Sequence, residues 1–144
     1  MTFERLLEFS ANHPVLVASF LLTLGLLLYL ELARRLGGVQ DIGVMQATAL
    51  SNRENALFLD VREDKEYRDG HIPGAVHIPL KQLPERLDEL GKYRDRPLVV
   101  CCRSGNRSSF AGRTLTKNGF ERVYNLDGGM KAWQSAGLPV SKKQ

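Results

Sequence analysis

The residue types best suited to chemistry in this chain gather in one short segment, from Cys102 to Arg107. The segment follows the apolar run Leu98–Cys101, so it reads as a loop that leaves a buried strand. Gly105 permits a positive φ that turns successive backbone N–H groups inward, and such groups at a helix start bind anions. These donors lower the pKa of a cysteine that begins the loop. We therefore expect Cys102 to be a nucleophile whose thiolate and persulfide are both stabilised there.

The remainder of this loop is expected to bind the substrate, because its amides and arginines favour an anionic sulfur donor such as thiosulfate. The candidate binding residues are Arg103, Ser104, Gly105, Asn106, Arg107 and Ser108. Ser108 or Ser109 is also expected to cap the helix that follows. The alternative for Cys102 is a small buried apolar residue, which is the usual role of a lone cysteine. The alternative for Arg107 is a solvated loop residue.

The two cysteines are adjacent in sequence, and adjacent cysteines are poorly placed to form a structural disulfide. This usage suits a reducing compartment. Cys101 ends the apolar run and is expected to face the core, with a resolving or relay role as the alternative. The three histidines show no metal-ligand spacing with the cysteines, so we expect neither a metal nor a cofactor.

Length and charge narrow the classes of function. The 144 residues suffice for one domain and an appendage. The formal net charge is +4, and the basic residues are mixed with acidic ones instead of forming a stripe with interleaved aromatic residues. This pattern argues against nucleic acid as a partner.

Short apolar runs alternate with helical stretches in the second part of the chain, a pattern typical of an α/β sandwich with a mostly parallel five-stranded sheet. The expected strands are Val39–Ile42, Leu57–Val61, Ala75–Ile78, Leu98–Cys101 and Val123–Leu126. The expected helices are Val44–Asn52, Lys65–Asp69, Leu83–Leu90, Ser108–Lys117 and Met130–Ser135. Ligands bind beyond the carboxyl ends of parallel strands, which is where the Cys102 loop begins.

The N-terminal part differs in composition from the remainder. No charged residue lies between Glu8 and Glu31, and the run Pro14–Leu30 is almost entirely apolar. We expect one transmembrane helix at about residues 14–33, within an anchor of residues 1–36 that precedes a domain of residues 37–144. Gly37 and Gly38 are expected to form the break between them. The alternatives are a buried core helix and a cleaved signal peptide.

The distribution of arginines around this run predicts its orientation. Arg5 precedes the run, whereas Arg34 and Arg35 follow it. Because basic residues collect on the cytoplasmic side, this favours a C-terminal domain in the cytoplasm, at the inner membrane if the protein is bacterial. A domain tethered in this way has a membrane protein as a reasonable partner.

Several motifs resemble those of the rhodanese-like sulfurtransferases over roughly residues 43–137. Cys102 to Arg107 is similar to the family's six-residue active-site loop, with Cys first, Arg second, Gly fourth and Arg or Thr sixth. Leu59–Arg62 resembles the family's Asp-Val-Arg strand end, and Gly70–Ala75 resembles its Gly-His-Ile-Pro-Gly-Ala turn. Leu126–Gly129 with Trp133 resembles its closing motif. The resemblance implies a three-layer sandwich. It also implies that Cys102 takes sulfur from a donor such as thiosulfate and passes it to cyanide or a thiol.

The residues outside the loop are expected to support it. Asp60, at a strand end, either hydrogen-bonds the loop or caps a turn. Arg62 and Glu66 either define the rim of the pocket or form a surface ion pair of little energetic value. His71 belongs to a rigid turn and is assigned no catalysis. The pair Gly128–Gly129 is expected to allow close backbone approach beside the site.

Two other functions remain as alternatives at this stage. Cysteine-dependent phosphatases use a similar loop with five residues between Cys and Arg, whereas this loop has the four residues 103–106, which favours sulfur over phosphate. A membrane-tethered binding module with little turnover would use the same fold to hold a partner. The retained Cys102 argues against an inactive module.

Overall fold

The computed structural model describes residues 2–37 and 39–142, and the side chains of residues 34–37 are not described. The expectations placed on Arg34, Arg35 and Gly38 therefore lie outside the described part. The chain divides into two compact units, residues 1–38 and residues 39–144. Each unit is described by itself.

The N-terminal unit consists of two helices, α1 (Phe3–Asn12) and α2 (Pro14–Gly37). Residues Pro14–Ala33 of α2 form a candidate membrane span with a mean hydropathy of 2.2, and none of this span is buried. A proline suits the start of a helix because its missing N–H would have no partner there. Helix α1, which the sequence did not predict, also has no buried residue. By length and composition α2 is able to cross a bilayer.

The second unit is built on a five-stranded sheet in the order β1-β5-β4-β2-β3, with every neighbouring pair parallel. Its strands are β1 (Gln40–Ile42), β2 (Leu57–Asp60), β3 (Val76–His77), β4 (Leu98–Cys101) and β5 (Val123–Leu126). Its helices are α3 (Val44–Glu54), α4 (Asp64–Asp69), α5 (Asn106–Lys117) and α6 (Gly129–Ser135), with the 3-10 segments η1 (Leu80–Glu85) and η2 (Leu87–Tyr93). The expected parallel α/β sandwich is confirmed.

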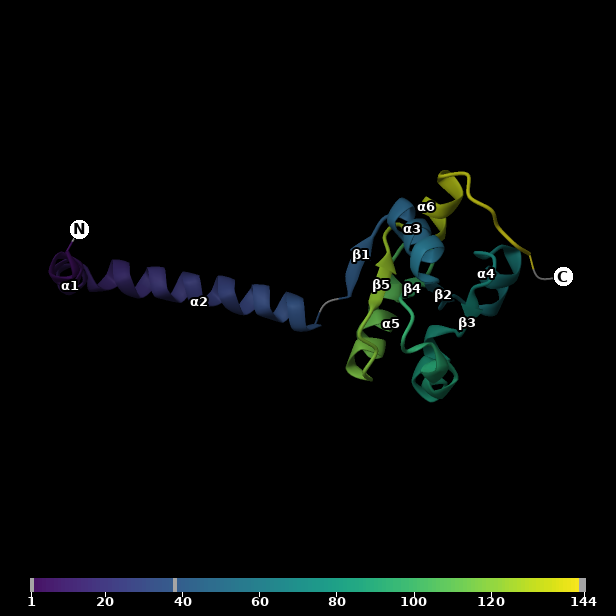
Figure 1. Cartoon of the computed structure of the whole chain (residues 1–144), viewed down its shortest axis with the longest axis horizontal. Helices are drawn as coiled ribbons and strands as arrows, with labels where there is room; N and C mark the ends of the chain where they lie inside the picture. The colour runs from purple at the N-terminus through teal and green to yellow at the C-terminus, as the bar shows by residue number, and fades with distance from the viewer. Residues whose placement is uncertain (1, 38, 143–144) are drawn as a thin grey trace. The chain divides into compact units, whose positions relative to one another are not determined.

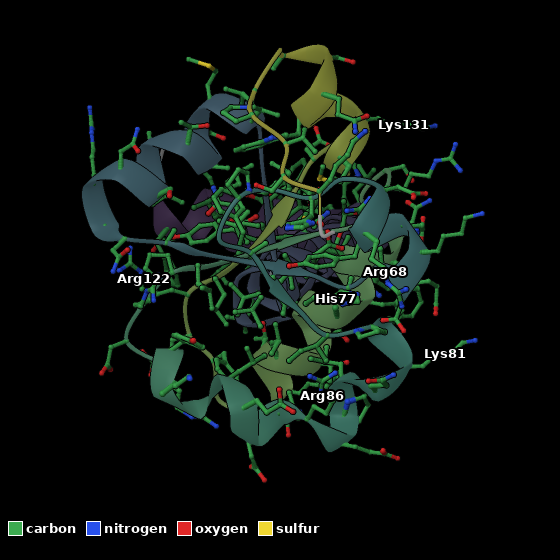
Figure 2. The ribbon with its side chains drawn as sticks, turned by 90° about the vertical axis from the view of Figure 1, so that its right-hand side faces the viewer. Arg68, His77, Lys81, Arg86, Arg122 and Lys131 are labelled. Carbon is green, nitrogen blue, oxygen red and sulfur yellow. The ribbon has the colours of Figure 1, made fainter. Side chains whose placement is uncertain are left out.

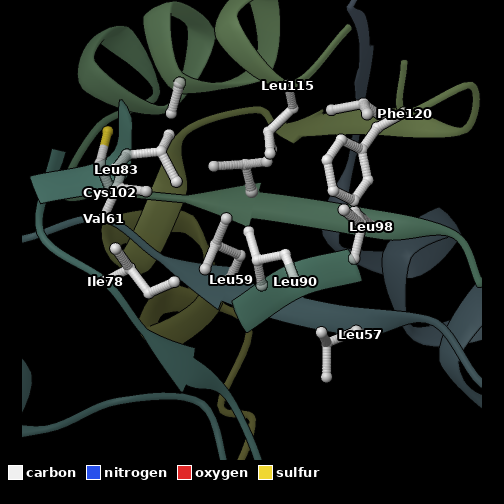
Figure 3. Packing of buried hydrophobic residues seen from close by; sticks show 13 residues of the cluster. Leu57, Leu59, Val61, Ile78, Leu83, Leu90, Leu98, Cys102, Leu115 and Phe120 are labelled. Atoms are coloured by element: carbon white, nitrogen blue, oxygen red, sulfur yellow. The ribbon is translucent and has the colours of Figure 1, made fainter. Parts of the chain in front are cut away.

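The sheet is covered on both faces (Figure 1), and each face has its own apolar cluster. The cluster on the side of α5, η1 and η2 is called the α5-side cluster, and that on the side of α3 and α6 the α6-side cluster. Figure 3 shows Cys102 at one end of the α5-side cluster, next to Val61 and Leu83. Because the central strands have apolar residues on both faces, they read as continuous apolar runs in the sequence.

Two local expectations are wrong. The single helix expected at Leu83–Leu90 is replaced by the two 3-10 segments, with Pro84 inside η1, where its missing N–H precludes regular α-helical bonding. Helix α5 begins at Asn106 with Gly105 as its N-cap, so neither Ser108 nor Ser109 caps it. The serines therefore lie within the first turns of α5, where their side chains are available for other contacts.

Candidate active site

The two cysteines lie at the end of β4 and point to opposite faces of the sheet. Successive side chains of a strand point to opposite faces, so Cys102 joins the α5-side cluster and Cys101 the α6-side cluster. Both side chains are buried, with Cys101 0% and Cys102 1% exposed, so the burial named as the alternative for Cys102 is present. Burial raises the pKa of the Cys101 thiol well above its ordinary value, and the nearby carboxylate of Asp60 raises it further. Cys101 therefore faces the core as a protonated thiol, whereas Cys102 lies on the other face at the start of the polar loop.

The Cys102 sulfur accepts hydrogen bonds from its own loop and from α5. The Gly105 backbone N–H donates to Sγ at 3.1 Å, and the Ser108 hydroxyl lies 3.3 Å from Sγ. Burial alone would raise the pKa of Cys102, but the Ser108 hydroxyl and the amides of Ser108, Gly105 and Ser104 outweigh it. The pKa of Cys102 is consequently lower than that of an ordinary cysteine, which favours its thiolate form.

The loop takes this shape because Gly105 adopts a left-handed conformation, with φ of +107°. Its other side rests on the start of α6. The backbone N–H of Met130 donates to the Cys102 carbonyl at 2.8 Å, and that of Lys131 donates to the Arg103 carbonyl at 3.2 Å. Between these bonds, Gly129 lies so close that an added Cβ would be 2.4 Å from the Cys102 carbonyl oxygen. The expected close approach at Gly129 is thus present.

Arg107 does not point its charge at the sulfur. Its guanidinium donates two hydrogen bonds of 2.8 Å to the carboxylate of Glu66 on α4. This ion pair, about one-third exposed on each side, lowers the pKa of Glu66 to about 2. The Arg107 charge, expected to favour an anionic donor, is thus paired with Glu66 and ties the start of α5 to α4, while the Gly105 amide and the Ser108 hydroxyl contact the sulfur.

Asp60 and Arg62 form a buried pair of their own. The Arg62 guanidinium donates to the Asp60 carboxylate, with its closest contact at 2.6 Å, and to the Gly70 carbonyl at 2.7 Å. The backbone N–H of Arg62 also donates to Asp60 at 3.0 Å, in the manner of a turn-capping aspartate. Asp60 is 0% exposed and makes no hydrogen bond to the cysteine loop among the described residues. The pair braces the end of β2, and the surface pair between Arg62 and Glu66 does not form.

The outer side of the loop is open and polar. Arg103, Ser104 and Asn106 are exposed. Arg103 also lines a pocket together with Arg62, Glu66, Asp69, Met130, Lys131 and Gln134. Figure 2 shows Lys131 on α6 and Arg68 on α4 on the same side of this unit. Arg62 and Glu66 line this pocket, but Cys102 does not, so their role at the rim of the cysteine site stays a prediction.

Sequence reasoning missed two residues of the site, Asn125 and Asp41. Asn125 is 5% exposed on β5, and its register places it beside Val100 of β4 and Asp41 of β1. Its Nδ2 group donates to the Asp41 carboxylate at 2.9 Å and to the Gly105 carbonyl at 3.2 Å, and its Oδ1 accepts from Ser108. A polar residue within an otherwise apolar strand was the only signal in the sequence.

The family model of the rhodanese-like domain matches residues 44–136 of the chain. The chain belongs to the rhodanese-like family. The crystal structure of a rhodanese-related protein from Thermoplasma volcanium superposes with a TM-score of 0.65 at 30% identity, covering 72% of this chain and 99% of that one. The rhodanese-like domain therefore covers residues 44–136, most of the second unit.

Relatives of this rhodanese-like chain differ in how much of its length they match. A sulfurtransferase of Allochromatium vinosum is 42% identical over 91 residues, which cover 63% of this chain and 83% of that protein. The uncharacterized protein YibN of Escherichia coli K12 is 30% identical over 138 residues, covering 95% of this chain and 96% of that protein. The similarity to YibN thus extends into the N-terminal helical unit.

Proposed function

We propose that this protein is a sulfurtransferase that carries sulfane sulfur as a persulfide on Cys102. The observation that carries the proposal is the pair of donors on Sγ, the Gly105 amide and the Ser108 hydroxyl, at the start of a six-residue loop. A nucleophilic thiolate beside fixed donors suits the transfer of an atom that arrives and leaves with negative charge. Relatives named as sulfurtransferases support the same activity.

Each half of the reaction is a displacement at sulfur. The Cys102 thiolate attacks the sulfane sulfur of a donor such as thiosulfate, a new S–S bond forms, and the S–S bond of thiosulfate breaks as sulfite leaves with its electron pair. The nucleophile of the acceptor, a thiolate or cyanide, then attacks the outer sulfur of the persulfide. Cys102 leaves as a thiolate, and the loop donors that stabilise it assist its departure.

Mass spectrometry of the intact chain after incubation with thiosulfate tests this proposal. We expect the mass of one added sulfur on Cys102, removed again by cyanide. Cys102→Ser is expected to abolish the adduct, and the adjacent Cys101→Ser, which changes the same atom on the opposite face of the sheet, is expected to retain it. Loss of the adduct in the Cys101 variant alone would identify Cys101 as the sulfur carrier. A wild-type chain that is never labelled by any sulfane donor would favour the binding-module alternative.

We further propose that α2 holds this domain at a membrane, with the domain in the cytoplasm. The support is the unburied apolar span Pro14–Ala33 and the excess of arginine after it. In fractionated cells the full chain is expected in the membrane pellet and residues 39–144 in the supernatant. Protease added to intact spheroplasts is expected to spare the domain. Digestion of the domain under those conditions would reverse the orientation, and a soluble full chain would exclude the anchor.

A further inference from the structure

The side-chain amide of Asn125 has only one orientation that satisfies its surroundings. One end of the amide faces the Asp41 carboxylate at 2.9 Å and the Gly105 carbonyl at 3.2 Å, and both of these groups are acceptors. That end must be the NH₂ group, because a carbonyl oxygen there would oppose two oxygens. The Oδ1 atom of Asn125 is consequently turned toward Ser108, where it can only accept a hydrogen bond.

Ser108 therefore stands between two acceptors with a single hydroxyl hydrogen. Its Oγ lies within hydrogen-bonding distance of Asn125 Oδ1 on one side and 3.3 Å from Cys102 Sγ on the other. Ser108 is 0% exposed and Asn125 is 5% exposed, so bulk water does not supply a substitute donor at this position. The hydrogen that Ser108 gives to one acceptor is withheld from the other.

We propose that Asn125 is a positioning residue that determines where the Ser108 hydrogen points and thereby how readily Cys102 becomes an anion. In the thiol state, the Cys102 S–H donates to Ser108 Oγ, and Ser108 donates to Asn125. In the thiolate state the Ser108 hydrogen turns to Sγ, and Asn125 Oδ1 loses its donor. The lost bond at Asn125 opposes thiolate formation, so Asn125 moderates the nucleophile that Ser108 activates.

The charged groups near the Asn125–Ser108–Cys102 network are paired with one another or lie away from the sulfur, so they do not account for the proposed influence of Asn125 on Cys102. Arg107 on α5 is neutralised by Glu66 on α4, and Asp60 at the end of β2 is paired with Arg62. Asp41 on β1 touches the far end of the Asn125 amide. The other cysteine, Cys101, lies on the other face of the sheet at the end of β4, and the exposed Arg103 follows Cys102 in the loop. The short-range hydrogen bonds to Sγ are therefore the contacts through which Asn125 acts.

A double-mutant cycle on the full chain in detergent micelles tests the proposal. The apparent pKa of Cys102 is measured from the pH dependence of its alkylation by iodoacetamide, with the Cys102 peptide quantified by mass spectrometry. Ser108→Ala is expected to raise this pKa. Asn125→Leu in the chain that retains Ser108 is expected to lower it by about 0.5 to 1 pH unit, the equivalent of one neutral hydrogen bond. In the Ser108→Ala background Asn125→Leu is expected to give no such decrease.

Asp41→Ala provides a second variant at an exposed position, where folding is not at risk. Asp41→Ala removes one of the two acceptors that hold the Asn125 NH₂ group and leaves the Gly105 carbonyl as the other. The amide is then held less firmly in this orientation, so the pKa of Cys102 is expected to fall by less than in Asn125→Leu, and only while Ser108 is present. Equal shifts in both backgrounds, or a raised pKa in Asn125→Leu with Ser108 present, would overturn the proposal. Alkylation does not require sulfur transfer, so these results are independent of the proposed function.

Discussion

Replacing Gly129 by alanine is expected to separate α6 from the cysteine loop. An added Cβ would lie 2.4 Å from the Cys102 carbonyl oxygen and 2.7 Å from the Arg103 carbonyl carbon. Real Cβ atoms essentially never approach heavy atoms closer than 3.0 Å. Because both neighbours are backbone atoms, no side-chain rotation relieves the contact. Either the loop or the first turn of α6 must move, and the bond from the Met130 amide to Cys102 is lost first.

The size of the effect follows from two contributions. Gly129 has φ of +54°, and a non-glycine residue in this left-handed region costs about 1–2 kcal/mol. Forcing an extra methyl group against packed atoms costs roughly 1–3 kcal/mol more. We therefore expect Gly129→Ala to lose about 2–5 kcal/mol of stability. Gly137 is a matched control, because its φ is +70° but no atom lies within 4 Å of its added Cβ. Gly137→Ala is expected to lose only about 1–2 kcal/mol.

Urea denaturation of residues 39–144, followed by the fluorescence of Trp133, measures both variants. This unit is compact and has its own two-sided core. Persulfide loading from thiosulfate is measured in parallel and is expected to slow in Gly129→Ala while Gly137→Ala loads normally. Equal losses of stability in the two variants would show that α6 and the loop do not touch in the way described, and would refute the reasoning.

Three further predictions follow from the ion pairs and the cysteines. The pKa of Glu66 is lowered from 4.5 to about 2, so its pairing with Arg107 stabilises the fold fully above pH 4.5, and the stabilisation is lost as the pH falls toward 2. Allowing for solvent screening of a partly exposed pair, this loss amounts to roughly 1 kcal/mol, and Glu66→Gln is expected to lack it in urea titrations across this range. Arg62→Met leaves the buried Asp60 unpaired and is expected to cost about 3–5 kcal/mol in the same assay, so a loss below about 1 kcal/mol would contradict the pairing. At pH 7 iodoacetamide is expected to modify Cys102 before Cys101 in the folded protein, because the pKa of Cys102 is lowered whereas that of Cys101 is raised, and peptide mapping that found Cys101 modified first would contradict this order.

The sequence predicted most strands and the position of the cysteine loop because both depend on short-range patterns. Continuous apolar runs mark strands buried on both faces, and Leu98–Cys101 and Val123–Leu126 have the predicted bounds. The positive φ at Gly105 follows from local backbone sterics. The burial of Cys101 follows from its place at the end of an apolar run.

Contacts between side chains on elements far apart in the sequence could not be predicted from such patterns. Arg107 and Glu66 lie on different helices, and their pairing depends on how α4 and α5 are rotated over the sheet. The contact between Asn125 and Ser108 depends on the register of β5 and on the depth of α5. Long-range polar contacts of this kind leave no period in the sequence. Only the unusual position of Asn125 within an apolar strand pointed to it.

The placement of the two cysteines on opposite faces of the sheet has a consequence for oxidative damage. A sulfenic acid formed on Cys102 by peroxide needs a nearby thiol to resolve it as a disulfide. The Cys101 thiol is buried on the opposite face of the sheet and points away from Cys102. Further oxidation to the sulfinic acid would then be irreversible. A bound sulfur atom is itself a reversible cap on the thiol, so the loaded enzyme is expected to survive peroxide better than the empty one.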